Sequence, residues 1–556
     1  MNESADELVF VPLGGLGEIG MNMALYGFGP RRARKWLMVD CGIAFAGPEQ
    51  AGIDVIVPDT TFIEKMKADL VGICITHAHE DHIGAITDLW GRLGAPIYAT
   101  RFAVGLLETK KLNEPGAPKL DLHTIAQGGK VLLGPFEVEF VAVAHSIPES
   151  CGLAIRTPLG TVVHSGDWKI DETPGIGLPT DKARFMAIGE EGVLALVCDS
   201  TNILREGFSP SEAQVGVTLA EIIRQAKGRV LVTTFASNAT RMRAVAEAAE
   251  AAGRQVILVG RAMERVATVA RELGMFDGLP PFLSADAFAH MPRDRVVVLA
   301  TGSQGEPRAA IARISEDEHP TVSLAPDDLV IFSSRTIPGN EREVGRIINN
   351  LVKQGVEVMT ADDALIHASG HPRRGEVAQL YDWVRPTIAI PAHGEEVHLA
   401  AHADFARERQ VPHVVKARNG DVVLLAPGEP GIVGEAPHGR VARDGNILLR
   451  MDAEALRERQ SLAFAGVVTI ALAVDGKGEM AGTPDVLTSG LPPRTKDGGA
   501  MDALVDAALF QTFDNLPRQR RRDADTVSTA IERAVRGAVG QAWGKRPSVH
   551  VLVVEV

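Results

Sequence analysis

The chain has 556 residues, too many for one ordinary domain, so about three to four hydrophobic cores are expected. Its 45% hydrophobic and 23% charged residues are typical of globular proteins and exclude a disordered or fibrous chain. The net charge of −14 and the aromatic content of only 5% argue against a protein that coats nucleic acid through bulk positive charge or many stacking rings.

Cysteine usage and hydropathy indicate a cellular compartment. No cysteine belongs to a CxxC pair, and each lies in or beside an apolar run: Cys41, Cys74, Cys151 and Cys198. This usage is typical of reduced, packed thiols in a cytosolic protein. The first ten residues lack the basic and apolar regions of an export signal, and no apolar stretch reaches about 18 residues. We therefore expect a cytoplasmic protein without a membrane partner.

Short apolar segments separated by glycines and polar loops dominate the first 200 residues, where helical periodicity is weak. This pattern predicts a strand-rich α/β domain. The clearest predicted strands are residues 9–13, 36–39, 71–76, 138–143, 161–164 and 194–198.

Helices alternate with strands from about residue 211 onward. Helices are predicted at residues 211–227, 240–253 and 261–273, and strands at residues 229–233, 255–259, 295–300 and 329–333. Such alternation predicts βαβ units around a parallel sheet, so we expect a second domain at residues 211–366.

The pattern changes again after residue 367. Short strands and polar loops return, including residues 387–391 and 421–425, and a Pro/Gly-rich stretch at 426–439 suggests a linker. Strands at 466–474 and 548–554, with helices at 499–514 and 526–539 between them, predict a small α+β unit. The expected divisions are residues 1–210, 211–366, 367–455 and 456–556.

One early motif has the spacing of a dinucleotide-binding turn. The segment from Gly15 to Gly20 matches GxGxxG, and Asp40 follows about 20 residues later. However, residues 21–26 read as a strand, so no helix N-terminus would be present to bind a pyrophosphate. We interpret the motif as a tight turn between two strands, with nucleotide binding as the alternative.

A dense group of metal-binding residue types follows the strand predicted at 71–76. Imidazole and carboxylate are ligands that suit Zn²⁺ and similar metals, and a charged surface loop is the alternative. Three more candidates each follow a predicted strand, and strand ends at one sheet edge converge. The set therefore predicts a two-metal site, with these candidates: His77, His79, Asp81, His82, His145, Asp167 and His393.

An HxHxDH motif, a lone His, an Asp and a late His resemble the metallo-β-lactamase superfamily. The resemblance implies an αββα sandwich that holds a dinuclear centre. It also implies the ligands: His77, His79 and His145 for one zinc, Asp81, His82 and His393 for the other, and Asp167 bridging both.

Further motifs resemble the β-CASP nucleases and, more narrowly, the bacterial ribonuclease J family. Asp199 lies in a segment similar to the first β-CASP motif, residues 366–371 are similar to the second, and His393 to the third. The 211–366 segment lies where that group carries its inserted domain, so residues 367–455 would complete the metallo-β-lactamase domain. Stretches similar to ribonuclease J are residues 13–20, 234–238, 301–307, 337–340 and 545–547.

The resemblance implies a metal-dependent ribonuclease that degrades single-stranded RNA from a 5′ end, with endonuclease action also expected, in RNA maturation and decay. The implied cofactors are two Zn²⁺ ions, with Mn²⁺ or Mg²⁺ as further candidates for activity. The implied partners are RNA, a second copy of the chain in a homodimer or homotetramer, and members of an RNA-degradation complex. A small-molecule metallohydrolase and a catalytically silent scaffold are the alternatives.

The candidate catalytic residues are Asp81, His371 and Asp199. Two adjacent metals can bind a hydroxide and stabilise both the attacking and the leaving oxygen in the hydrolysis of a phosphodiester. Asp81 would orient the hydroxide. His371 would contact the scissile phosphate and assist the leaving oxygen, and Asp199 could hold and polarise its ring. For Asp199 the alternative is an acid that caps a turn.

Candidates for substrate binding lie in two loops. The family resemblance assigns residues 367–371 to the substrate, and backbone N–H groups in this small-residue loop could cradle a phosphate. Ser237 and Asn238 follow a strand and open a helix, which suits either an anion site or ordinary helix capping. The residues of the first loop are His367, Ala368, Ser369, Gly370 and His371.

Two weaker features remain. Some relatives place a structural calcium at positions matching Asp54 and Asp444, although an exposed turn is the alternative. The basic run of Arg518 and residues 520–522 reads as a solvated face, with RNA contact as the alternative.

Overall fold

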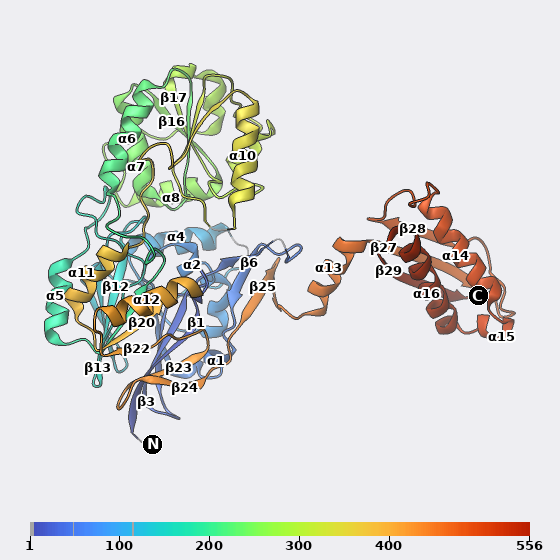
Figure 1. The fold of residues 1–556 in the computed structure, drawn as a ribbon, viewed down its shortest axis with the longest axis horizontal. Coiled ribbons are helices and arrows are strands. Elements are labelled where there is room, and N and C mark those ends of the chain that lie inside the picture. Colours follow the sequence, from blue (N-terminus) through green and yellow to red (C-terminus); the bar gives the residue numbers. More distant parts are fainter. Residues whose placement is uncertain (1–4, 48, 114–115, 338) are drawn as a thin grey trace. The chain divides into compact units, whose positions relative to one another are not determined.

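The computed structural model describes residues 5–47, 49–113, 116–337 and 339–556. Their contacts form two compact units, drawn in Figure 1. The first comprises the residues up to Ala44 together with Val57–Gly439, and the second comprises Phe45–Ile56 with Arg440–Val556. Within the described part of the chain, no helix is long and apolar enough to cross a membrane.

Two β-sheets form the centre of the first unit. The first sheet contains, in spatial order, β24 (Gly431–Glu435), β23 (Asp421–Ala426), β1 (Asp6–Gly14), β3 (Met23–Pro30), β4 (Lys35–Val39), β7 (Leu70–Cys74), β8 (Ile97–Ala99) and β9 (Leu122–Thr124). The second contains β10 (Lys130–Leu133), β11 (Phe136–Ala142), β12 (Cys151–Thr157), β13 (Gly160–His164), β14 (Ala195–Asp199), β20 (Ile388–Ala392) and β22 (His413–Val414).

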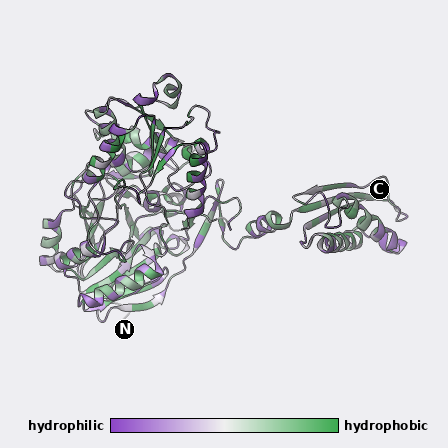
Figure 2. Cartoon of the chain, turned by 45° about the horizontal axis from the view of Figure 1, so that its top comes forward, coloured by the Kyte–Doolittle hydropathy of each residue, from purple (hydrophilic) through white to green (hydrophobic). Residues whose placement is uncertain are grey.

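The two sheets pack face to face through a shared apolar core. Phe10 and Tyr26 of the first sheet belong to the same buried cluster as Phe140 and Ile155 of the second. Figure 2 shows strands rich in hydrophobic residues, and helices on which hydrophobic and hydrophilic residues both occur. We call these two sheets and their helices the sandwich.

Helices cover the outer faces of the sandwich. A second buried cluster joins the β14 sheet to three helices, α5 (Lys182–Glu191), α11 (Arg374–Val384) and α12 (Glu396–Glu408). β7, β8 and β9 are parallel, so their connections must cross over a face of their sheet, and the inner face is already occupied. These connections contain α2 (Glu80–Ile83), α3 (Ile86–Leu93) and α4 (Arg101–Asn113), and α1 (Thr61–Glu64) precedes β7. The predicted αββα sandwich is thus confirmed.

A parallel sheet with helices is inserted between β14 and β20. Its strands are β16 (Gln255–Val259), β17 (Val296–Ala300), β15 (Val230–Thr233), β18 (Leu329–Phe332) and β19 (Glu357–Met359). Its helices are α6 (Glu212–Gln225), α7 (Ala239–Ala251), α8 (Arg261–Glu272), α9 (Ala310–Ser315) and α10 (Glu341–Lys353). The central strands are buried and apolar except for Thr233, as parallel strands covered on both faces must be. We call α6 to β19 the inserted domain; it confirms the predicted alternation.

The C-terminal unit is a small α+β structure, as predicted. Its three-stranded sheet has the order β28 (Asp485–Ser489), β27 (Val467–Val474) and β29 (Ser548–Glu555), and α14 (Met501–Asn515) and α16 (Ala524–Trp543) pack on one face. A second sheet has the order β26 (Ile447–Arg450), β25 (Arg440–Asp444), β6 (Val55–Pro58) and β5 (Ala44–Phe45). The unit also contains α13 (Glu454–Ala465) and α15 (Arg518–Arg521).

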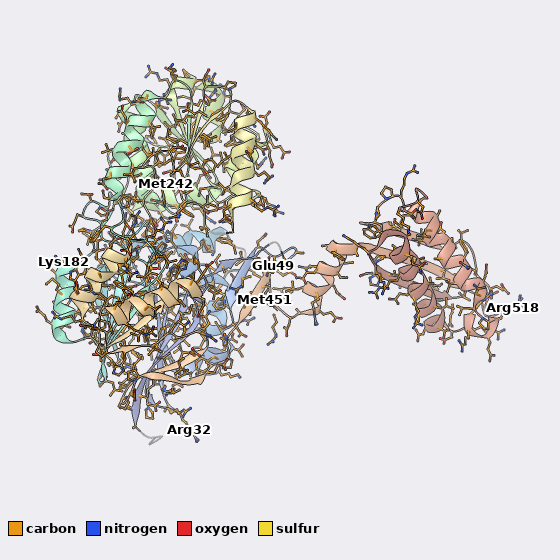
Figure 3. The ribbon with its side chains drawn as sticks, viewed as in Figure 1. Arg32, Glu49, Lys182, Met242, Met451 and Arg518 are labelled. Atoms are coloured by element: carbon orange, nitrogen blue, oxygen red, sulfur yellow. The ribbon has the colours of Figure 1, made fainter. Side chains whose placement is uncertain are left out.

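The basic run lies at α15. Arg518, labelled in Figure 3, is 78% exposed and pairs with Glu479. The Arg521 guanidinium lies over the Phe513 ring at 5.0 Å and donates to the Leu516 carbonyl at 2.8 Å. These local partners support the interpretation as a solvated face.

The structure corrects two predictions on secondary structure. The stretch at 426–439 is not only a linker, because β24 within it pairs with β23 and extends the first sheet. The region after residue 367 is not limited to strands and loops, because it contains α11 and α12. Helix α11 begins with an arginine and a glycine, and α12 mixes alanine, histidine and charged residues, so tertiary packing determines the state of both helices.

Other expectations hold. All four cysteines are free and buried. The glycine motif connects the antiparallel strands β1 and β3, and within it β2 (Leu16–Gly17) pairs with β21 (Gly394–Glu395). Gly15, Gly17 and Gly20 have φ between 76° and 103°, which glycine adopts without strain, so the motif is a turn between strands.

Candidate active site

Strand ends at one edge of the sandwich carry the candidate residues. β13, β14 and β20 are parallel neighbours, so Asp167, Asp199 and His393, which end or follow them, meet at the same edge. The loop after β7 supplies His77 and His79, the latter in extended backbone, and α2 supplies Asp81 and His82. The sequence thus brings distant segments together through sheet topology.

The first group of candidate ligands comprises His77, His79, His145 and Asp167. Their ligand atoms all lie within 4.8 Å of one another. The Nδ1 atom of His79 lies 3.1 Å from His77 Nε2 and 3.0 Å from His145 Nε2, and Asp167 Oδ2 lies 3.7 Å from His77 Nε2. Three imidazole nitrogens and one carboxylate oxygen that face one point form a donor set that suits Zn²⁺.

The second group comprises Asp81, His82, His393 and again Asp167, also within 4.8 Å. His82 Nε2 lies 3.2 Å from Asp167 Oδ2, and His393 Nε2 lies 3.3 Å from Asp81 Oδ2. Asp167 therefore belongs to both groups. The Oδ1 atom of Asp167 is buried and has no hydrogen-bond partner among the described residues. A bound cation would satisfy such an oxygen.

Polar partners hold the other ring nitrogen of most of these histidines. Such partners fix the tautomer and aim the free nitrogen at a metal. The pairs are His77 Nδ1 with Thr76 Oγ1 at 3.0 Å, His82 Nδ1 with Asp40 Oδ2 at 2.7 Å, His145 Nδ1 with the Gly370 carbonyl at 2.6 Å, and His393 Nδ1 with Thr201 Oγ1 at 2.8 Å.

The histidines of the two groups differ in the direction of their pKa shifts. Burial lowers the pKa of His77 and His145 well below the ordinary value and that of His79 to about 4, so these rings are neutral, as metal ligands must be. Burial also opposes the charged forms of His82 and His393, but neighbouring carboxylates, Asp167 first, outweigh it and raise the pKa of both rings. The second group therefore attracts positive charge.

His371 lies beside both groups and pairs with Asp199. Its Nδ1 is 2.8 Å from Asp199 Oδ2, and its ring stacks on that of His393 with centroids 5.3 Å apart. Burial lowers the pKa of His371, but the Asp199 and Asp167 carboxylates outweigh burial and raise it above the ordinary value. The two carboxylates therefore favour the protonated form of this ring, whose Nε2–H can donate to an anion.

The loop of residues 367–371, which we call the phosphate loop after the role predicted for it from the sequence, is held at several points. Asn202 Nδ2 donates to Ser369 Oγ at 2.8 Å and to the His371 carbonyl at 3.1 Å. A Cβ atom on Gly370 would lie 2.5 Å from the His145 ring, so only glycine fits there. Ala368 is buried, while burial and then the Arg241 charge lower the pKa of His367 to about 3.

Comparison with known proteins identifies the family. The metallo-β-lactamase superfamily model matches residues 31–187, the ribonuclease J β-CASP domain residues 227–351, the Zn-dependent metallo-hydrolase RNA specificity domain residues 355–415, and the ribonuclease J C-terminal domain residues 454–556. Ribonuclease J of Sinorhizobium meliloti is 50% identical over 551 residues, which cover 99% of this chain and 98% of that protein. This chain belongs to the ribonuclease J family.

Other relatives agree. Ribonuclease J of Corynebacterium glutamicum is 38% identical over 99% of this chain and 76% of its own, and that of Mycolicibacterium smegmatis is 38% identical over 98% and 96%. A solved structure of a protein of unknown function from Enterococcus faecalis matches with a TM-score of 0.52 at 14% identity, covering 75% of this chain and all of that one. This last likeness shows the fold alone. The family resemblance read from the motifs is confirmed.

Not all predicted residues join the site. Asn238 caps α7 by accepting a hydrogen bond from the Arg241 backbone N–H at 2.8 Å, which is the capping alternative, while Ser237 is half-buried beside it. In the C-terminal unit, Asp444 accepts an ion-paired hydrogen bond from Arg459 at 2.6 Å, and Asp54 joins no group of metal-binding side chains found among the described residues. Calcium at Asp54 and Asp444 stays a prediction. In the 337–340 stretch, Pro338 lies outside the described residues.

Sequence reasoning missed the partners behind the ligands. The sequence patterns single out Asp40 only as the acidic residue of a dinucleotide-binding motif. In the structure its carboxylate accepts a hydrogen bond from the Thr76 backbone N–H at 2.8 Å and contacts His82. Its position directly after β4, where strand ends converge, was the available signal. Thr201 and Asn202, which follow Asp199 in the same motif, could have been found in the same way.

Proposed function

We propose that this chain hydrolyses single-stranded RNA from the 5′ end, with endonuclease cleavage at the same site, in RNA maturation and decay. Membership of the ribonuclease J family makes it a metal-dependent ribonuclease. The match to a Zn-dependent metallo-hydrolase RNA specificity domain over residues 355–415 includes the phosphate loop and His393. A small-molecule hydrolase would need neither this segment nor the inserted domain, and the complete set of ligand types disfavours a silent scaffold.

The observation that carries the mechanism is that Asp167 belongs to both groups described above, and also to a third that joins it to Asp199, His371 and His393. We propose two Zn²⁺ ions, one held by His77, His79 and His145 and the other by Asp81, His82 and His393, with Asp167 touching both. Mn²⁺ or Mg²⁺ could replace zinc during activity. Bound metal would supply a hydroxide at neutral pH and neutralise charge on the phosphate.

The chain's own residues would orient and protonate the substrate. Asp81 belongs to the second ligand group, and its side chain is 30% exposed. Its carboxylate can therefore accept a hydrogen bond from the attacking water. His371, held by Asp199, can in its protonated form donate a hydrogen bond from Nε2–H to a non-bridging oxygen and then give that proton to the leaving oxygen. The phosphate loop and, at the start of α7, Ser237 and Asn238 would bind neighbouring phosphates, although the Asn238 oxygen is already used in capping.

The remaining parts of the proposal concern organisation. We propose that the chain acts in the cytoplasm as a homodimer or homotetramer and joins an RNA-degradation complex. The metallo-β-lactamase domain would comprise residues 1–210 and, with the linker, 367–455, the β-CASP domain residues 211–366, and the C-terminal domain residues 456–556. A structural calcium at Asp54 and Asp444 would require Arg459 to release Asp444. Light scattering after gel filtration would give the oligomer order.

One digestion experiment tests the activity. A single RNA is prepared with 5′ monophosphate, triphosphate or hydroxyl and labelled at either end. Mononucleotides released mainly from the monophosphate form would establish 5′→3′ exonuclease action, and internal fragments from all three would show endonuclease action. His77→Ala and His79→Ala should abolish both, whereas His123→Ala, an exposed histidine on β9, should leave both unchanged. Cleavage retained by the first two variants would refute the metal mechanism.

A further inference from the structure

Four charged side chains are buried together where the inserted domain meets the sandwich. Lys169 and Asp171 lie just after Asp167, whereas Glu212 begins α6 and Arg241 lies on α7, next to Met242, which Figure 3 labels. Each of the four is at most 3% exposed. Lys169 Nζ lies 2.9 Å from Asp171 Oδ2 and 3.7 Å from Glu212 Oε1, and Arg241 Nη2 donates to Glu212 Oε2 at 2.8 Å.

The network joins two separate parts of the fold. The Asp171 carboxylate also accepts a hydrogen bond from the Glu212 backbone N–H at 2.9 Å, so the first turn of α6 is attached to the sandwich. Two cations face two anions, and the network is electrically balanced. We call Lys169, Asp171, Glu212 and Arg241 the seam network.

Stability alone does not require such a network. Removing each charge from water costs several kcal/mol, and apolar side chains of similar volume often stabilise a protein as well or better. What the hydrogen bonds from Arg241 to Glu212 and from the Glu212 N–H to Asp171 add is direction, because each donor and acceptor must meet at a defined angle and distance. A buried network at this position is therefore suited to fixing geometry.

One end of the network is attached to the metal ligands. The Lys169 backbone N–H donates to the Ala144 carbonyl at 2.8 Å, and Ala144 directly precedes His145. Lys169 also stands only two residues after Asp167, the residue shared by both ligand groups. The Lys169 carbonyl accepts from Thr180 Oγ1, whose oxygen in turn accepts from the Ala144 N–H at 2.9 Å. Lys169 is thus fixed to both ligand-bearing segments.

The other end is attached to the phosphate loop. Arg241 Nη1 donates to the Ile366 carbonyl at 2.8 Å, and Ser333 Oγ donates to the same carbonyl at 2.6 Å. Arg241 Nη1 also contacts Ser333 Oγ. Ile366 is the residue before His367, so the guanidinium holds the point at which the chain leaves the inserted domain and enters the loop.

We propose that the residues of the seam network are positioning residues for RNA cleavage. They fix the start of the phosphate loop relative to His145 and Asp167, so that a phosphate held by the loop lies against the metal ligands. This inference rests on the proposed ribonuclease function. The network touches neither the ligand atoms nor His371, and it acts through the backbone at Ala144 and Ile366.

The far end of the loop has an independent support. The buried Glu376 carboxylate accepts hydrogen bonds from three backbone N–H groups, those of Ile170 at 2.8 Å, Ser209 at 2.9 Å and Arg373 at 2.7 Å. Disruption of the seam network therefore loosens the loop at its first residues and leaves its end at Arg373 in place. The expected result is a displaced loop in a folded chain.

The test uses Glu212→Gln and Arg241→Lys in the full-length, zinc-loaded chain. Glutamine keeps the volume and one acceptor of Glu212, and lysine keeps the charge but loses the fork that reaches Glu212 and Ile366. Asp328→Asn is the matched control, because Asp328 is equally buried in the inserted domain and bonds Arg293 at 2.9 Å, away from the seam. Asp171→Asn is the second seam variant if either of the first two fails to fold.

Three measurements are made per folded chain: kcat and KM on 5′-monophosphorylated RNA, zinc content, and hydrogen exchange of residues 366–371. For the seam variants we expect kcat at least tenfold lower, unchanged zinc content and faster exchange in the loop, whereas Asp328→Asn should change none of the three. Wild-type kcat in folded seam variants, or zinc lost in parallel with kcat, would overturn the inference. Absence of RNA cleavage by the wild-type chain would instead refute the proposed function.

Discussion

Gly370→Ala should disable the site through a single methyl group. The added Cβ would lie 2.5 Å from His145 Cε1, 2.6 Å from His145 Nδ1 and 2.8 Å from Ser146 Oγ. Ordinary carbon contacts lie at about 3.5–4.0 Å, so the ring or the loop must move by roughly 1 Å. The Gly370 carbonyl also accepts the hydrogen bond from His145 Nδ1 that orients this ligand. The methyl group would therefore disrupt the contact that joins the phosphate loop to the first ligand group.

The magnitude follows from that displacement. A misplacement of about 1 Å at a reacting centre can cost about 100-fold in rate, and overpacking of a filled core costs about 1–3 kcal/mol of stability. We therefore expect kcat/KM on RNA to fall about 100-fold or more, with weaker zinc binding and a lower unfolding free energy. The assays are initial-rate RNA cleavage, zinc content by mass spectrometry and denaturant unfolding.

A second glycine provides the control. Gly345 lies on α10, and a Cβ there would meet nothing within 4 Å. Gly345→Ala should leave activity unchanged and raise stability by about 0.5–1 kcal/mol, because alanine loses less backbone entropy in a helix. If Gly370→Ala cleaved RNA within about threefold of the wild type with full zinc content, the contact between the loop and His145 would not govern the site.

Two further predictions concern residues behind the site. Asp40→Asn keeps one oxygen for the Thr76 N–H but turns an NH2 group toward His82, and should weaken metal binding about 10–100-fold, measured by competition with a chelator; equal affinity would contradict the role of Asp40. His402, buried between Ser200 and Tyr381, has its pKa lowered to about 4 by burial. Its folded pKa lies below the unfolded value of about 6.5, so its contribution to stability is complete above pH 6.5 and falls by roughly 3 kcal/mol as the pH drops toward 4. Unfolding free energies at pH 7 and pH 5 should therefore differ less in His402→Gln than in the wild type, and an equal difference would refute the assignment.

Sequence patterns predicted the elements that carry strong periodicity. The strand predicted at residues 295–300 is β17 at Val296–Ala300, and the helix predicted at 261–273 is α8 at Arg261–Glu272. These segments are either apolar throughout or clearly two-faced, so local composition determines their state. The metal-binding residue types were visible for a related reason, since such a density of histidine and acid is rare outside a site.

Other features depend on contacts that no local pattern encodes. The Pro/Gly-rich stretch at 426–439 contains β24 because an exposed edge of the first sheet is available to pair with it. Residues 45–56 group with the C-terminal unit through pairing across several hundred positions. The seam network likewise joins residues 169, 171, 212 and 241, which are ordinary charged residues when read one at a time.

The net charge leads to a last prediction. The formal charge of the chain is −14, and the acids of the site are ionised, because nearby histidines, together with other groups, hold the pKa of Asp81, Asp167 and Asp199 below the usual range despite burial. RNA is itself a polyanion, so its affinity for this site depends on positive charge added by metal. Chelation should weaken RNA binding at least tenfold in fluorescence anisotropy, and zinc added back should restore it. Full affinity in the metal-free chain would show that the phosphate loop and the inserted domain bind RNA without the ions.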